Sequence, residues 1–324
     1  MDVKWTIRRF NPSDRPHYLA WRKLVAHRDK NPEFIEWEYY SSPYGPVETW
    51  VADVDGKIVG QYSLQRYDCY YFGKLIRASL CFDVATHPDY RNQGMFTKLG
   101  FHSLKKEGES NVSFTIGFPW VGGIAIPGHM KVGWSKLGEL GIYSKTDLIT
   151  NEHQDIDAFQ IKQITTFDDR FDELAETHKT DLPIMLKRSA AYLNWRYIQK
   201  LGYVYHCFEI LKGEQLVGYF ILKLYVSEKS KTLHIIDYII PKNPSLYQEV
   251  LDFVITYAKN NDVQKVNLVI NENHHFFQFL EESNFNREER FFIPIVHRNN
   301  DTIDNDLLID FKNHYLTMGD NDIF

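Results

Sequence analysis

The sequence is poor in cysteine, in net positive charge and in long apolar segments, and each shortage excludes a class of protein. Three scattered cysteines, Cys69, Cys81 and Cys207, form neither a disulfide framework nor a metal-ligand pattern. Lys and Arg number 37 against 43 Asp and Glu, and the net charge of −6 argues against a general nucleic-acid binder. No apolar run approaches the length of a membrane span, and MDVKWTIRRF contains no apolar signal core. We therefore expect a cytoplasmic protein with no metal ion, no membrane span and no nucleic-acid partner.

Two stretches of the chain, beginning FIEWEYY and YLNWRYI, repeat one pattern. Each carries Trp-x-Tyr on a helix-like segment, followed by a strand, a glycine turn and a second strand with Val-Gly. The same number of residues separates Trp37 from Gly60 and Trp195 from Gly218. Downstream, CFDVATHP and IIDYIIP each end an apolar strand with an Asp and then a Pro. The chain therefore contains two copies of one α/β unit.

We expect each copy to be a domain, because 324 residues of which 44% are hydrophobic suffice for two cores. The expected domains are residues 1–145 and 155–297, separated by the polar stretch LITNEHQDID. Residues 298–324 are rich in Asp and are expected to form a loosely attached acidic extension. Within the first copy, Asp55-Gly56 between two apolar runs predicts a β-hairpin.

The stretch DVATHPDYRNQGMF, from Asp83 to Phe96, predicts a strand that ends at Pro88, then a glycine loop, then a helix that begins near Met95. The free backbone N–H groups at such a helix N-terminus bind anions. Gly94 would let the backbone approach the anion closely, and Arg91 would add charge. The alternative is that Gly94 only makes a turn and Arg91 is solvated.

This order of elements, together with HPDYRNQG and the later KVGW, resembles the GNAT acyltransferase family over most of residues 1–145. The resemblance implies a central mixed β-sheet flanked by helices in each copy. It implies a loop that binds the pyrophosphate of coenzyme A through backbone amides, formed here by Arg91, Asn92, Gln93, Gly94, Met95 and Phe96. It also implies a strand that pairs with the pantetheine arm, formed here by Val84, Ala85 and Thr86.

The sequence departs from the family pattern at two places. Phe96 stands where the family usually has a small residue. The second copy continues after Pro241 as KNPSLYQEVLDF, without a glycine loop. We therefore expect the second copy to be a degenerate GNAT-like domain that does not bind coenzyme A.

Two residues are the catalytic candidates that the resemblance implies. His129 lies four residues before Gly133, where the family commonly has a Tyr that protonates the leaving thiolate. An imidazolium could do the same with a pKa suited to neutral pH, although His129 could equally pack on a short helix. Asp83 lies where family members often carry a base that acts directly or through water. Its counterpart Asp237 in the second copy fits a shared structural role equally well.

The resemblance implies an N-acyltransferase that uses acetyl-CoA, or another acyl-CoA, as co-substrate. The expected acceptor is the amine of a small molecule such as an amino sugar or a specialised metabolite. One alternative is a non-catalytic coenzyme A- or ligand-binding protein, which Phe96 and the missing Tyr favour. Another is a peptide-forming aminoacyl transferase, against which the pyrophosphate-type loop argues.

Overall fold

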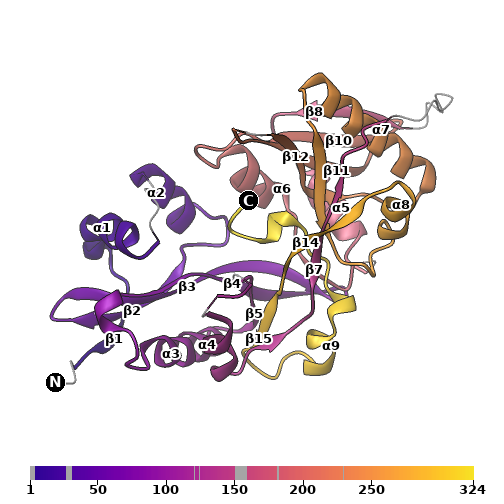
Figure 1. Ribbon diagram of the computed structural model, residues 1–324. Coiled ribbons are helices and arrows are strands. Elements are labelled where there is room, and N and C mark those ends of the chain that lie inside the picture. Colours follow the sequence, from indigo (N-terminus) through magenta and orange to yellow (C-terminus); the bar gives the residue numbers. More distant parts are fainter. Residues whose placement is uncertain are drawn as a thin grey trace. The chain divides into compact units, whose positions relative to one another are not determined.

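The computed structural model describes residues 4–26, 31–119, 121–123, 125–149, 159–180, 182–228 and 230–324 (Figure 1). The chain divides into two compact units, each an α/β unit with a mixed β-sheet, as the sequence predicted. The first unit contains Met1–Gly138 and Phe292–Phe311, and the second contains Glu139–Phe291 and Lys312–Phe324. Each unit is therefore built from two separate pieces of the chain.

The sheet of the first unit has the strand order β1-β2-β3-β4-β5-β15-β6. Within this order, β4 and β5 pair in parallel. The strands are β1 (Thr6–Arg9), β2 (Glu48–Val54), β3 (Lys57–Tyr71), β4 (Lys74–Thr86), β5 (Val112–Gly117), β6 (Ser135–Lys136) and β15 (Ile295–Arg298). The helices are α1 (Arg15–Ala26), α2 (Pro32–Tyr40), α3 (Met95–Glu109), α4 (Ala125–Lys131) and α9 (Asn305–Ile309). The predicted hairpin is confirmed, because β2 and β3 pair through Val54 and Lys57 around left-handed Asp55 and Gly56.

Two apolar clusters define the faces of this sheet. One cluster joins side chains of α3 and the segment after α4 to the sheet, among them Leu99 and Trp134. The other joins α1 and α2 to the sheet, among them Trp21 and Ile35. Helices α3 and α4 therefore cover one face of the sheet, and α1 and α2 cover the other.

The second unit has the strand order β14-β7-β13-β12-β11-β10-β8, with β12 and β13 parallel. The strands of this sheet are β7 (Leu140–Lys145), β8 (Gln160–Ile164), β10 (His206–Lys212), β11 (Gln215–Val226), β12 (Lys231–Ile239), β13 (Lys265–Ile270) and β14 (Asn286–Phe292). The unit also contains β9 (Ile184–Leu186), which is not part of this sheet. Its helices are α5 (Arg170–Thr177), α6 (Ala190–Leu193), a π-helical turn (Asn194–Ile198), α7 (Pro244–Asn260) and α8 (Phe277–Glu282). The parallel pair β12–β13 corresponds to β4–β5 of the first unit.

The units differ from the expected boundaries. Leu140–Lys145 is a strand of the second sheet and Ile295–Arg298 is a strand of the first, so no single cut near 145 or 297 separates them. The expected break at LITNEHQDID falls mainly on residues 150–158, outside the described part of the chain. The segment 298–324 is not loosely attached, because it divides between the two units and buries apolar side chains such as Leu308 and Met318.

Candidate active site

The sheet of the first unit opens between β4 and β5. Their parallel pairing ends at Cys81 and Gly117, whereas β4 continues to Thr86 along β3. The N–H of His87 donates to the carbonyl of Val59 on β3, at 2.9 Å. Because the backbone groups of successive strand residues point to opposite edges, those of Val84 and Thr86 face the open side. Backbone donors and acceptors thus lie along one wall of the opening.

The predicted anion loop follows this wall. Asn92 and Gly94 have left-handed backbones, with φ of 63° and 69°, and α3 begins directly after Gly94. Gly94, at the N-cap of α3, has no side chain that could accept from the first-turn N–H groups, and no side-chain hydrogen bond caps this helix end in the described part of the chain. A Cβ added to Gly94 would meet nothing within 4 Å, so the space before the loop is open. The loop therefore presents unused backbone donors at the positive end of a 15-residue helix.

The bulk of Phe96 is accommodated by a glycine on the facing helix. A Cβ on Gly128 of α4 would lie 2.8 Å from the Phe96 ring, so only glycine leaves room for it. The Phe96 ring also lies 5.0 Å from the His129 ring. Phe96 packs against α4, and α3 keeps its regular start at Met95. The departure from a small residue therefore leaves the amides of the loop free.

His129 lies on α4 with 5% of its surface exposed. Its ring contacts Phe96 and Trp134, with centroids 5.0 Å apart in each case, and its Nδ1 lies 3.4 Å from the hydroxyl of Tyr62. Burial lowers the pKa of His129 to about 4. The expected pKa near neutrality is therefore wrong, because apolar rings disfavour the imidazolium. The proton-donor role itself stays a prediction.

Asp83 lies where β4 bulges away from its register with β3, and its φ is 50°. One oxygen of its carboxylate lies 2.6 Å from Nη1 of Arg22, and the other accepts a hydrogen bond of 2.8 Å from the hydroxyl of Tyr39. The Tyr39 hydroxyl in turn accepts from Tyr18, at 2.6 Å, and from the amide of Gln61, at 3.0 Å. A buried polar network thus holds the carboxylate at the start of the opening.

Sequence reasoning identified Asp83 but missed Arg22, Tyr18 and Gln61. These three residues come from α1 and β3, and no motif or spacing relates them to β4. The only signal available was their polar character within apolar patterns. Backbone strain at Asp83, a non-glycine residue with positive φ, is typical of functional positions but was invisible in the sequence.

The second unit contains a similar network, but its carboxylate is shielded from solvent. Asp237 accepts a hydrogen bond of 2.9 Å from Tyr197 and pairs with Arg188 at 3.3 Å. Asp237 is fully buried, whereas the side chain of Asp83 keeps 11% of its surface exposed. The repeat supports a structural role for the network in both units, and only the carboxylate of the first unit is partly exposed.

The helix of the second unit that corresponds to α3 is capped. The side chain of Asn243 accepts hydrogen bonds from the N–H groups of Ser245 and Leu246, and Pro244 at the first position has no N–H. The amides that are free at α3 are thus used or absent at α7. This difference is the physical counterpart of the missing glycine loop.

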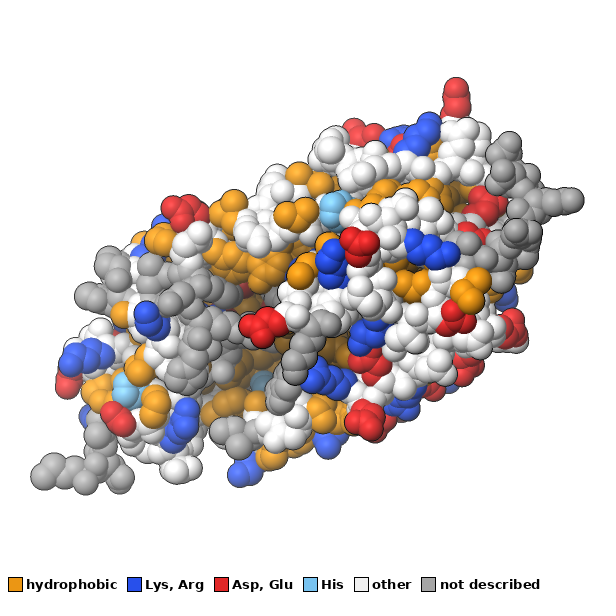
Figure 2. All heavy atoms as spheres, turned by 45° about the horizontal axis from the view of Figure 1, so that its top comes forward, with side chains coloured by type: hydrophobic (Ala, Val, Ile, Leu, Met, Phe, Trp, Pro, Cys, Tyr) orange, Lys and Arg blue, Asp and Glu red, His pale blue; other side chains and the backbone are white. Residues whose placement is uncertain are grey.

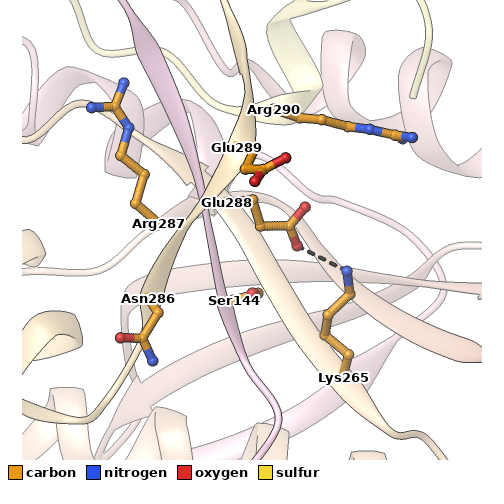
Figure 3. Close-up of a pocket in the computed structure, with 7 residues that line it drawn as sticks. All are labelled: Ser144, Lys265, Asn286, Arg287, Glu288, Glu289 and Arg290. Atoms are coloured by element: carbon orange, nitrogen blue, oxygen red, sulfur yellow. Dashed lines mark hydrogen bonds and ion pairs between the residues drawn. The ribbon is translucent and has the colours of Figure 1, made fainter.

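Other features of the chain lie apart from these groups. Among the described residues, no three His, Cys, Asp or Glu side chains are grouped as metal ligands, and no helix is both long and apolar enough to cross a membrane. Acidic and basic side chains are interspersed on the face drawn in Figure 2. The second unit has an open pocket lined by charged residues of the edge strand β14 and by Ser144 and Lys265 (Figure 3). The ammonium of Lys265 lies 2.8 Å from the carboxylate of Glu288. Such alternating charges protect an edge strand from pairing with other chains.

Comparison with known proteins shows a family that residues 6–137 resemble. The family model described as an acetyltransferase (GNAT) domain matches residues 6–137. No curated protein matches the chain. A GCN5-related N-acetyltransferase from Anabaena variabilis has a similar structure, with a TM-score of 0.74 and 14% identity over 92% of this chain and 73% of that one.

Two further solved structures resemble the chain. A conserved protein of unknown function from Enterococcus faecalis, described as a probable N-acyltransferase, has a TM-score of 0.71 and 11% identity over 91% of this chain and 73% of that one. A tandem GNAT protein from the clavulanic acid biosynthesis pathway has a TM-score of 0.58 and 10% identity over 93% of this chain and 100% of that one. At these identities the comparisons show a similar fold, and the similarity extends over both units.

Proposed function

Since residues 6–137 match the family model of the GNAT acetyltransferase domain, we propose that the chain is an acyl-CoA-dependent N-acyltransferase, specifically an N-acetyltransferase that acts on the amine of a small molecule. The observation that carries the proposal is the contrast between α3 and α7. The N-terminus of α3 is uncapped and faces open space at Gly94, whereas the N-terminus of α7 is capped by Asn243. Coenzyme A therefore binds the first unit alone.

In this proposal, the chain holds the cofactor through two sets of backbone groups. The loop Arg91–Phe96 provides N–H groups and one cationic side chain for the pyrophosphate. Val84, Ala85 and Thr86 provide the strand edge for the pantetheine arm. The bound co-substrate would supply the acyl group as a thioester. The open space at Gly94 and the uncapped first turn of α3 fit a phosphate group there.

Asp83 is the proposed proton acceptor for the acceptor amine, directly or through water. Its carboxylate lies at the start of the opening and is partly exposed, and Arg22 and Tyr39 fix its orientation. An amine attacks only when it is neutral, so a nearby carboxylate that takes its proton promotes the reaction. A carboxylate also favours a cationic acceptor, which agrees with an acceptor that is an amine.

The leaving thiolate needs little assistance, because thiols ionise at a pH of about 8.5. We therefore assign His129 to the packing around Phe96 and Trp134, where its imidazole is uncharged at neutral pH. The proton-donor role expected from its place before Gly133 becomes the alternative that the His129→Ala variant tests. A cytoplasmic location belongs to the proposal, since Cys69, Cys81 and Cys207 are buried thiols outside disulfides.

The test is thiol release from acetyl-CoA with a panel of small amines, in parallel with a binding measurement. Amine-dependent thiol release would support the proposal, and mass spectrometry of the product would identify the acylated nitrogen. Binding of coenzyme A without turnover for any amine would support the non-catalytic alternative. Absence of coenzyme A binding would overturn both.

A further inference from the structure

The segment Lys312–Phe324, hereafter the C-terminal segment, is part of the second unit and is drawn in yellow in Figure 1. Composition suggested a loosely attached acidic extension, but residues 313–319 are all buried. Tyr315, Leu316 and Met318 are 5%, 6% and 2% exposed. The segment therefore fills a space in this unit that its position in the sequence did not indicate.

That space is the opening between β12 and β13. Their pairing ends at Ile235 and Leu268, although β12 continues to Ile239. The hydroxyl of Tyr315 donates to the carbonyl of Tyr238 on β12, and the side chain of Asn271, just after β13, donates to the carbonyl of His314 at 3.1 Å. The C-terminal segment thus forms hydrogen bonds to both walls of the opening.

The residue contacted on β12 has a direct counterpart in the first unit. Tyr238 follows Asp237 as Val84 follows Asp83, and Val84 belongs to the strand edge proposed to pair with the pantetheine arm. The main-chain carbonyl of Tyr238 is already used by Tyr315. The C-terminal segment therefore takes up a hydrogen-bonding group that corresponds to a cofactor-binding group of the first unit.

The segment also completes the buried charge network. Thr317 donates its hydroxyl proton to Asp237 at 3.0 Å, and Asp320 pairs with Arg188 at 2.8 Å. Arg188 is 1% exposed, so without Asp320 and Thr317 its buried guanidinium would keep only Asp237 and the carbonyl of Leu186 as partners. Buried charges are stable in a protein only when their hydrogen bonds are satisfied.

One glycine makes this fit possible. A Cβ on Gly319 would collide with the hydroxyl of Tyr197 and would lie 3.2 Å from the side chain of Asp237. Both neighbours are buried and held by hydrogen bonds to each other, so neither can move away cheaply. The position therefore admits glycine alone, and the contact is specific in shape as well as in charge.

From these contacts we infer that the C-terminal segment is a built-in peptide ligand of the second unit. It occupies the opening that the first unit leaves for its substrates. The second unit is thus a peptide-binding unit whose ligand lies in the same chain. The second unit has no glycine loop after Pro241, and the segment fills the opening between β12 and β13.

Hydrogen exchange of the wild-type chain, without coenzyme A, tests this inference first. Amides of residues 314–320 should exchange as slowly as those of β12, on the order of 10³-fold more slowly than in an unstructured peptide. Exchange of 314–320 at the rate of an exposed segment, while β12 stays protected, would overturn the inference. Neither outcome depends on acyl transfer, so the test is separate from the proposed function.

A second experiment tests the identity of the site. In full-length Gly319→Val the segment should leave the cleft, and a fluorescein-labelled peptide of residues 312–324 should then bind. The peptide should bind this variant at least about 100-fold more tightly than the wild-type chain, where the covalently linked segment competes. Ile323→Ala, at an exposed position of the same segment, is the matched control and should bind as weakly as wild type.

The peptide carrying Gly319→Val should not bind, because its side chain collides with Tyr197. Equal binding of both peptides, or no binding of the wild-type peptide to the Gly319→Val chain, would overturn the inference. Gly319→Ala, with a smaller side chain, replaces the valine variant if that chain does not fold.

Discussion

Two matched substitutions separate the role of Asp83 from that of its counterpart in the second unit, Asp237. Asp83→Asn removes the charge but keeps the shape, and asparagine tolerates the left-handed backbone at this position. Asp237→Asn makes the same change in the second unit, where the carboxylate is fully buried and inaccessible. Both variants lose a buried ion pair, but only Asp83→Asn removes an accessible carboxylate from the opening.

The stability cost follows from the burial of the ion pair. The side chains of Arg22 and Asp83 are 4% and 11% exposed, and removing one partner of a buried pair costs about 3–5 kcal/mol. The amide oxygen of asparagine still accepts a hydrogen bond, so we expect about 3 kcal/mol. In a unit of this size, that corresponds to a fall in Tm of about 6–12 °C. The Asp237→Asn variant should lose less, because Arg188 keeps Asp320 as a partner.

We expect kcat to fall in Asp83→Asn but not in Asp237→Asn. Loss of a general base typically lowers kcat by about 10²–10⁴-fold, and the affinity for coenzyme A should not change, because the loop is untouched. Steady-state thiol release, at a temperature where both variants are folded, measures kcat. Near wild-type turnover of folded Asp83→Asn would refute the base role and leave Asp83 with the structural role of Asp237. An equal loss in Asp237→Asn would show that the loss reflects folding.

Three further outcomes follow from the packing around the site. Gly128→Val should lower Tm because the valine side chain collides with Phe96, and Phe96→Ala in the same chain should recover part of that loss. Thermal melts of the single and double variants measure the Tm values, and additive losses would contradict the contact. His129→Ala should lower kcat by less than about tenfold, because the imidazole is neutral at the assay pH, whereas a loss of about 10²-fold or more in steady-state kinetics would restore the proton-donor role. The free energy of unfolding should fall as the pH drops from 6.5 toward 4, since burial lowers the pKa of His129 to about 4 and that of His274 to about 3, so that only the unfolded chain binds these protons. Urea titrations over this range measure the slope, and a stability that does not change with pH would argue against the burial of these two histidines.

Local signals predicted the elements around the loop well. Asp55-Gly56 produced the expected hairpin, and the glycine after the Pro88 turn preceded a helix that begins at Met95. These features depend on the backbone preferences of a few neighbouring residues, and those preferences follow from the residue types alone. The division into two α/β units followed from the internal repeat. The central mixed sheet in each unit was implied by the resemblance to the GNAT family.

Long-range pairing could not be predicted in the same way. Leu140–Lys145 and Ile295–Arg298 have ordinary strand patterns, and nothing local indicates which sheet each one joins. The pairing of Arg22 with Asp83 likewise depends on how α1 packs on the sheet. The expectation of a loosely attached extension for residues 298–324 was wrong because it rested on their many Asp residues, whereas Asp320 is buried against Arg188. Composition alone does not reveal that a charge has a buried partner.

The central claim is that one chain binds one coenzyme A, at the loop of the first unit. Isothermal titration of the wild-type chain should give a stoichiometry of one. Gly94→Val should weaken binding by at least about tenfold, because a branched side chain fills the open space before the loop and disfavours its φ of 69°. Asn243→Ala, which removes the cap of α7 in the second unit, should leave both affinity and stoichiometry unchanged. Two sites per chain, or an affinity unaffected by Gly94→Val, would contradict the account.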